Sequence, residues 1–239
     1  MKIGVLIETT AVDFPSILAT SLFLKGCNLR CPYCYNKELV TNQLSENEGV
    51  TFEEVINHLE KRKNVLKGFV ISGGEALLSP HLEPLILEAK KLGYKIKLDT
   101  NGTLPFLLEK IIKNPELCPD FIALDVKTSL EKYKVLMPFA DENQIEKIKN
   151  AIKESIKIVS KFPAEKREFR TVLVPSLINQ EDIEQIAKLL PKDASWNFAQ
   201  FRNENCLDSK YNEISPYTEK DALKLIDFAK TIIPQAKLR

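Results

Sequence analysis

The amino-acid sequence predicts an α/β fold in which six strand–helix units form a partial (β/α)6 barrel of the TIM-like type. Two observations support this fold class. Strand-like and helix-like segments alternate along most of the 239 residues, and charged side chains occupy one face of three predicted strands. We expect a single domain over 1–239, with its core at about 15–205 and a last helix at about 217–233.

The predicted strands are short and rich in apolar residues. In chain order they are ILATSLFL (17–24), GFVIS (68–72), YKIKLD (94–99), FIALDVK (121–127), EFRTVLVP (168–175) and WNFAQF (196–201). A further strand-like segment, KIGVLIE, lies at 2–8, and ILATSLFL leads into a loop with cysteines. Strand–helix units in succession predict parallel strands joined by right-handed crossovers.

The predicted helices lie between these strands and after the last one. They cover 51–63, 81–93, 104–113, about 142–161, 180–190 and 218–233. Thr51 and Glu54 have the spacing of a capping box, and Thr218 begins the last helix with a similar pattern. Gly93 is placed to end the second helix, and Pro105 fits the first turn of the third.

The charged strand faces distinguish between two architectures, an open doubly wound sheet and a partial barrel. The residues concerned are Lys95, Lys97 and Asp99, then Asp125 and Lys127, and finally Arg170. Parallel strands covered by helices on both faces should be apolar throughout, and burying charges without partners is costly. A barrel with its helices outside and a polar ligand in its interior accounts best for the pattern.

Composition and charge limit the functional classes. The chain has 34 basic and 33 acidic residues and a net charge of +1, which gives no field for a nucleic acid or a membrane surface. Its apolar runs are far shorter than the roughly 20 residues that a membrane helix needs. No signal-peptide pattern follows Met1. We therefore expect a cytoplasmic protein that binds neither nucleic acid nor membranes.

Three of the five cysteines, Cys27, Cys31 and Cys34, lie within eight residues in KGCNLRCPYCYN. A structural zinc site needs four ligands, and His58 and His81 are isolated in the sequence. A redox dithiol at 31–34 would leave Cys27 unexplained. A four-iron cluster held by three thiolates would keep one open coordination site on iron. The cluster is favoured once the motifs further along the chain are counted.

The segment CNLRCPYC resembles the signature loop of radical S-adenosylmethionine (SAM) enzymes. This resemblance implies that a [4Fe–4S] cluster is held by Cys27, Cys31 and Cys34. The amino and carboxylate groups of SAM would then chelate the fourth iron, and Tyr33 would pack near the adenine. The fold that the resemblance implies is the radical SAM core.

The segment SGGEALL resembles the GGE motif of the same family. The resemblance implies that Gly73, Gly74 and Glu75 meet the methionine amino group of SAM. Glycines suit a close approach of backbone to ligand, and a carboxylate suits an ammonium group. The family usually has Pro-Thr after the glutamate, where this sequence has Ala76 and Leu77.

The segments LDTNG and ALDVK resemble the activating enzymes of glycyl-radical enzymes. The implied SAM-binding residues are Asp99, Thr100, Asn101, Asp125, Lys127, Arg170 and Gln200. Of these, Asp99, Thr100 and Asp125 would also match a monovalent-cation site, with a backbone carbonyl near Ala123. Oxygen ligands suit a hard cation. The alternative interpretation is a structural network of salt bridges.

The resemblance covers about residues 10–220 and also includes CYNKELV and FAQFR, where Gln200 or Arg202 could reach the ligand. It implies an enzyme that cleaves SAM and places a glycyl radical on a partner. This sequence has no cysteine-rich insert of the kind that some activators carry. It therefore resembles the shorter activators, whose partners are anaerobic ribonucleotide reductase or pyruvate formate-lyase, and we prefer the former. A flavodoxin or ferredoxin would supply the electron, and no side chain need act as an acid or base.

Two other functions stay open on the sequence alone. One is a radical SAM enzyme acting on a small molecule, similar to 7-carboxy-7-deazaguanine synthase. The other is a non-catalytic zinc or iron–sulfur binding module. Cys118 and Cys206 are expected to be buried small hydrophobic residues rather than ligands.

Overall fold

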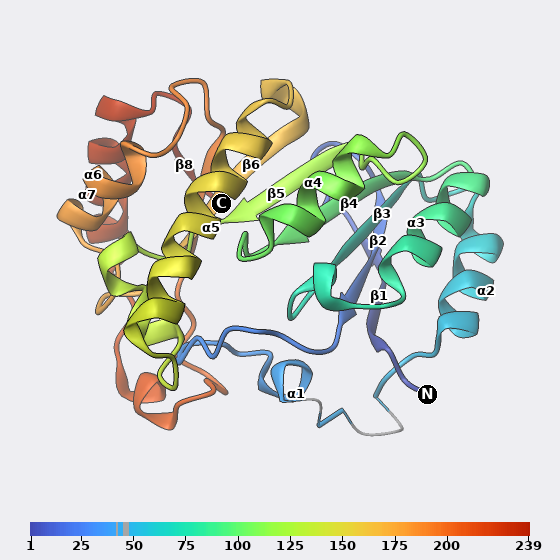
Figure 1. The fold of residues 1–239 in the computed structure, drawn as a ribbon, viewed down its shortest axis with the longest axis horizontal. Helices are drawn as coiled ribbons and strands as arrows, with labels where there is room; N and C mark the ends of the chain where they lie inside the picture. The colour runs from blue at the N-terminus through green and yellow to red at the C-terminus, as the bar shows by residue number, and fades with distance from the viewer. Residues whose placement is uncertain (42, 45–47) are drawn as a thin grey trace. The chain divides into compact units, whose positions relative to one another are not determined.

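Figure 1 shows the computed structural model of the chain, which describes residues 1–41, 43–44 and 48–239. These residues group into two compact units. The first consists of Met1–Asn28, Glu38–Thr100 and Phe106–Ile122, and the second of Leu29–Lys37, Asn101–Pro105 and Ala123–Arg239. The single domain expected from the sequence stays a prediction.

Among its described residues, the first unit contains four complete strands that pair in chain order. They are β1 (Gly4–Thr10), β2 (Ala19–Leu24), β3 (Gly68–Gly73) and β4 (Lys95–Thr100). Strands β2, β3 and β4 pair in parallel, as predicted, and the register places Leu24 opposite Gly73. Strand β1 instead pairs antiparallel with β2. The connection at 11–18 is too short for a parallel crossover, which needs a dozen or more residues.

Three helices of the first unit follow the predicted ranges closely, and two short helical elements, at 37–40 and 76–78, were not predicted. They are α1 (Lys37–Val40, whose first residue belongs to the second unit), α2 (Phe52–Arg62), η1 (Ala76–Leu78), α3 (Leu82–Lys91) and α4 (Pro105–Lys113, whose first residue also belongs to the second unit). Helices α2 and α3 pack side by side beside the strands (Figure 1). The capping box of Thr51 and Glu54 is present. Gly93 follows α3 with φ of 85°, so the predicted glycine stop is confirmed.

Strand β5 (Phe121–Asp125) begins in the first unit and ends in the second. The further strands of the second unit are β6 (Arg167–Leu173), β7 (Trp196–Gln200) and β8 (Lys237–Leu238). The backbone N–H of Val126 donates to Arg170 (2.9 Å), which joins the end of β5 to β6. Strands β6, β7 and β8 are parallel. The two-residue β8 was not predicted, because so short a segment has no periodicity of its own.

The helical elements of the second unit are η2 (Leu130–Leu136), α5 (Glu142–Ser160), η3 (Ala164–Lys166), α6 (Gln180–Ala187), η4 (Ser209–Glu213) and α7 (Glu219–Ile232). Helices α6 and α7 pack against each other (Figure 1). Thr218 caps α7 by accepting from the N–H of Asp221. The predicted helix at 180–190 is shorter than expected and ends at Ala187. Among the described residues, no helix is both long and apolar enough to cross a membrane.

Candidate functional site

The cysteine loop carries free thiols. All five cysteines are unbridged, so the pair at 31–34 is not a disulfide. Cys31 is buried, whereas Cys27 and Cys34 are partly exposed. The N–H of Cys34 donates to the carbonyl of Cys31 (3.0 Å), which forms a turn around Tyr33. Cys206 is buried as expected, but Cys118 is partly exposed.

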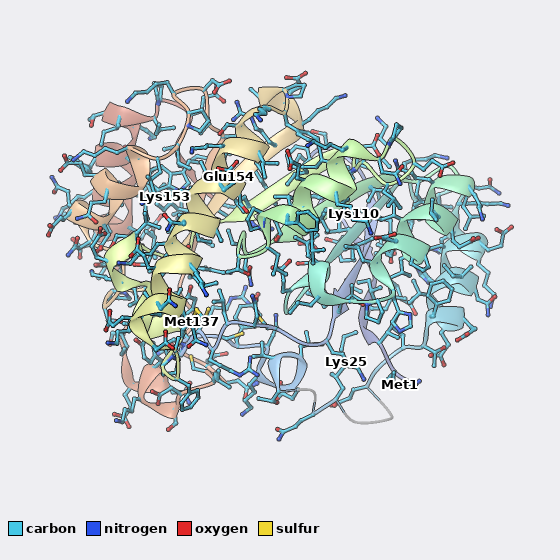
Figure 2. The ribbon with its side chains drawn as sticks, viewed as in Figure 1. Met1, Lys25, Lys110, Met137, Lys153 and Glu154 are labelled. Atoms are coloured by element: carbon cyan, nitrogen blue, oxygen red, sulfur yellow. The ribbon has the colours of Figure 1, made fainter. Side chains whose placement is uncertain are left out.

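The part of this loop in the second unit is held by backbone hydrogen bonds to distant segments. The N–H of Arg30 donates to Leu136 (2.8 Å), at the end of η2. The next residue, Met137, is labelled in Figure 2. On the other side, Leu207 donates to Cys34 and Asp208 donates to Pro32, both at 2.9 Å. Backbone contacts of this kind leave no side-chain pattern, so they could not be predicted from the sequence.

In the first unit the GGE segment lies against the residues that precede the cysteine loop. The N–H of Glu75 donates to the carbonyl of Gly26 (2.8 Å). A Cβ added to Gly74 would lie 2.0 Å from the Gly26 oxygen and 3.1 Å from the Cβ of Cys27. Gly73, with φ of 119°, adopts a conformation that side chains rarely allow. The structure thus brings the predicted residues Gly74 and Cys27 together.

Two more of the predicted residues meet at the ends of β3 and β4. Glu75 is 1% exposed, and its Oε1 accepts hydrogen bonds from Thr100 Oγ1 (2.9 Å) and from the Leu77 N–H (3.1 Å). On the same strand as Thr100, Asp99 pairs with the fully buried Lys97 (2.6 Å). Of the predicted charged face of β4, Lys97 and Asp99 are therefore buried as an ion pair, whereas Lys95 at the start of the strand is exposed.

In the second unit, Asp125 pairs with two cationic side chains. Its Oδ2 lies 2.8 Å from Lys127 Nζ, and its Oδ1 lies 2.6 Å from Arg170 Nε. Burial acts to raise the pKa of Asp125, but Arg170 and Lys127 outweigh it and hold the pKa well below its usual range. Burial acts to lower the pKa of Lys127, but Asp125 and Cys31 raise it above the ordinary value. All three groups are therefore charged at neutral pH.

This arrangement bears on the predicted cation site. Both carboxylate oxygens of Asp125 already accept from positive groups, Lys127 and Arg170. A carboxylate that balances two cations is a weak ligand for a third. The geometry therefore favours the salt-bridge interpretation for Asp125, and the monovalent cation stays a prediction.

The remaining predicted residues have different surroundings. Asn101 uses its side-chain oxygen to accept from the N–H and the hydroxyl of Thr103 (3.0 and 2.6 Å), as in a turn. The buried Oε1 of Gln200 has no hydrogen-bond partner among the described residues. Arg202 is exposed.

Tyr33, in the part of the cysteine loop that belongs to the second unit, is buried. Its side chain is 6% exposed, and its hydroxyl has no hydrogen-bond partner among the described residues. Burial, followed by the charges of Cys31 and Asp125, raises the pKa of this hydroxyl well above the ordinary value. A second tyrosine, Tyr133, is fully buried, and its hydroxyl accepts from the N–H of Lys127 (3.3 Å).

Three buried residues near the predicted ones were missed. Tyr133 resembles any core aromatic in the sequence, so nothing distinguished it. Glu168 and Asn197 are both at least nine-tenths buried, and Asn197 Nδ2 donates a hydrogen bond to Glu168 Oε2 (2.6 Å). Their position did carry a signal. Glu168 lies two residues before Arg170, on the same face of β6, and Asn197 lies opposite Arg170 in the register.

The donor set suits an iron–sulfur cluster in its chemistry. Cys27 belongs to the first unit and Cys31 and Cys34 to the second. Within the part of the chain that the structure describes, no three His, Cys, Asp or Glu side chains are arranged to hold a metal ion. The fit therefore rests on three unbridged thiols within eight residues and on the buried Tyr33 hydroxyl in the same loop, for which the described residues offer no hydrogen-bond partner.

A comparison with protein families identifies the superfamily. The family model described as the radical SAM superfamily matches residues 21–190, which is well over half of the chain. This chain belongs to the radical SAM superfamily. Its cofactors are accordingly a [4Fe–4S] cluster and SAM, as the cysteine loop predicted. The protein is a radical SAM enzyme, which sets aside the non-catalytic binding module.

Two relatives of this radical SAM enzyme carry the names of activating enzymes. A protein of Methanocaldococcus jannaschii, provisionally named as a glycyl-radical enzyme activating enzyme, is 32% identical over 98% of this chain and 94% of its own length. The pyruvate formate-lyase-activating enzyme of Clostridium pasteurianum is 31% identical over 75% of this chain and 71% of its own length.

A solved structure confirms the fold class. The structure of TYW1 with a lysine-pyruvate adduct bound matches with a TM-score of 0.61 and 16% identity, over 89% of this chain and 73% of that one. Radical SAM structures of this kind have a partial TIM barrel, so the predicted α/β fold with parallel strands is confirmed.

Proposed function

We propose that this radical SAM enzyme is an activase that generates a glycyl radical on a partner enzyme, anaerobic ribonucleotide reductase. The observation that carries the proposal is the match, over nearly the full length of both chains, to a relative named as an activating enzyme. The match to a pyruvate formate-lyase-activating enzyme supports the same class of partner. Ribonucleotide reductase is the finer choice, and its support is the resemblance of FAQFR to the last-strand region of the ribonucleotide reductase activators.

Each cofactor has proposed ligands in this chain. The cluster would be held by Cys27, Cys31 and Cys34, and the close packing of Gly74 on Gly26 supports the position of Cys27. When bound, the cluster and SAM supply reductive cleavage of a C–S bond of SAM and a 5′-deoxyadenosyl radical that takes hydrogen from a glycine Cα.

The side chains of the chain bind and orient SAM rather than transfer protons. Glu75 would accept from the methionine ammonium group, which a buried carboxylate can bind strongly. Lys127 and Arg170 would bind the SAM carboxylate, because both stay positively charged beside Asp125. Tyr33 would pack near the adenine. Asp99, Thr100 and Asn101 at the end of β4 and Gln200 at the end of β7 complete the proposed set.

The test is the transfer of a radical to a purified partner. The protein would be reconstituted anaerobically with iron and sulfide, then mixed with dithionite, SAM and the anaerobic ribonucleotide reductase of the same organism. We expect 5′-deoxyadenosine in solution and a glycyl-radical signal in the electron paramagnetic resonance (EPR) spectrum. A reductase variant with alanine in place of the radical glycine should give no such signal.

The other outcomes are informative. A radical on pyruvate formate-lyase alone would keep the activase and refute the choice of ribonucleotide reductase. Productive cleavage of SAM with a small molecule and no partner protein would favour the alternative, an enzyme similar to 7-carboxy-7-deazaguanine synthase. Replacing dithionite with reduced flavodoxin or ferredoxin tests the proposed electron donor in the same assay. The cytoplasmic location stays a prediction.

A further inference from the structure

The hydroxyl of Tyr33 is a buried donor for which the described polypeptide offers no acceptor. The side chain is 6% exposed, and none of the residues that the structure describes forms a hydrogen bond with the oxygen. Leaving a buried hydroxyl unpaired costs about 1–3 kcal/mol, and folded proteins pair nearly all such groups. The structure therefore indicates that this donor is meant for an atom that does not belong to the chain.

The protein groups around the hydroxyl identify which atom that is. Burial raises the pKa of the Tyr33 hydroxyl, and so do the charges of Cys31, Asp125, Tyr133 and Cys34, which therefore act on it electrostatically. Asp125 already accepts from Lys127 and Arg170 through its two oxygens.

The turn from Cys31 to Cys34 keeps Tyr33 between two thiols that are proposed to hold the cluster. A cluster held by these two thiols would bring sulfur atoms, which accept hydrogen bonds, to the residues on either side of Tyr33.

We propose that the Tyr33 hydroxyl donates a hydrogen bond to a sulfur atom of the [4Fe–4S] cluster and thereby raises its reduction potential. The cluster becomes more negative on reduction, and a donor aimed at one of its sulfurs stabilises that added charge. Hydrogen bonds to the sulfurs and limited solvent exposure are known determinants of cluster potential. The inference rests on the cofactor and not on the identity of the partner enzyme.

The experiment measures the potential in the absence of SAM. Wild-type protein and Tyr33→Phe would be reconstituted anaerobically, assayed for iron and sulfide, and titrated in a spectroelectrochemical cell with EPR detection. We expect full iron content in both proteins and a potential that is more negative in Tyr33→Phe. The phenylalanine keeps the buried ring and removes only the donor.

Two matched variants serve as controls. Tyr35→Phe removes a hydroxyl from the same loop, but its side chain is 53% exposed, so its potential should equal that of the wild type. Tyr133→Phe removes a buried hydroxyl that is held by the Lys127 N–H and lies outside the Cys31–Cys34 turn, so its shift should be smaller than that of Tyr33→Phe. A shift in Tyr133→Phe that is as large would overturn the assignment to Tyr33.

Two further results would overturn the proposal. One is an unchanged potential in Tyr33→Phe with a full cluster. The other is an unchanged potential with weakened SAM binding, which would show that the hydroxyl serves the adenine. If Tyr33→Phe does not hold iron, replacement of Tyr33 by 3,5-difluorotyrosine gives a stronger donor of similar size. Its potential should then be more positive than that of the wild type, and a value equal to or below it would refute the hydrogen bond.

Discussion

Replacing Gly74 with alanine tests how the GGE segment positions the first cysteine. The new Cβ would lie 2.0 Å from the Gly26 oxygen, whereas ordinary contacts begin at 3.4 Å, so the two backbones must separate by about 1.4 Å. The hydrogen bond from the Glu75 N–H to Gly26 (2.8 Å) would then be strained or lost. Because Cys27 follows Gly26 directly, its thiol would move with the displaced backbone.

The magnitude follows from two contributions. Overpacking in a close contact costs about 1–3 kcal/mol, and one hydrogen bond contributes about 1 kcal/mol. Gly74→Ala should therefore lower the free energy of unfolding by about 2–4 kcal/mol. For a chain of this size that corresponds to a fall of about 4–16 °C in melting temperature. Incorporation of iron should also fall well below that of the wild type.

The control is Gly93→Ala. Gly93 has φ of 85°, but a Cβ there would have no atom within 4 Å. Backbone strain should lower the free energy of unfolding of Gly93→Ala by about 1–2 kcal/mol, and this variant should bind iron normally. The measurements are thermal unfolding by circular dichroism and iron and sulfide content after anaerobic reconstitution. Full iron loading and wild-type stability in Gly74→Ala would refute the reasoning.

Three other variants test separate parts of the molecule. Cys31→Ala should lose the visible absorption of the cluster and all formation of 5′-deoxyadenosine; retained absorption would exclude Cys31 as a ligand. Asp125→Ala should keep the cluster but bind SAM more weakly in a titration. Its free energy of unfolding should fall by about 3 kcal/mol, because Lys127 and Arg170 lose the carboxylate that pairs with them. Unchanged affinity would count against its role. Thr51→Ala removes the cap of α2 and should cost about 1 kcal/mol in chemical denaturation, with normal iron content.

The elements with strong local signals were predictable from the sequence. Helix α2 begins where Thr51 and Glu54 place it, and Gly93 ends the segment of α3. These signals depend on a few neighbouring residues, so they survive in a single sequence. The antiparallel direction of β1 could not be predicted from the residues of β1 itself, because it depends on the length of the connection to β2.

The candidate site was predictable to the extent that it depends on residue type. Cysteine spacing indicated the cluster, and the superfamily match confirmed it. The pairing of Asp125 with both Lys127 and Arg170 was one of two interpretations, the other being a ligand site. Alternation along a strand predicts which side chains share a face, but it does not predict which of them form ion pairs. The unpaired hydroxyl of Tyr33 could not be predicted, because it depends on burial by residues far away in the sequence.

The two backbone hydrogen bonds from Leu207 and Asp208 to the cysteine loop have a consequence for the maturation of the enzyme. Both donors are made long after the thiols have left the ribosome. At roughly 5–20 residues per second, translation from Cys34 to Asp208 takes about 10 to 35 s. Throughout that interval the nascent cysteine loop lacks both of these hydrogen bonds, so its backbone support is complete only after Asp208 has been made.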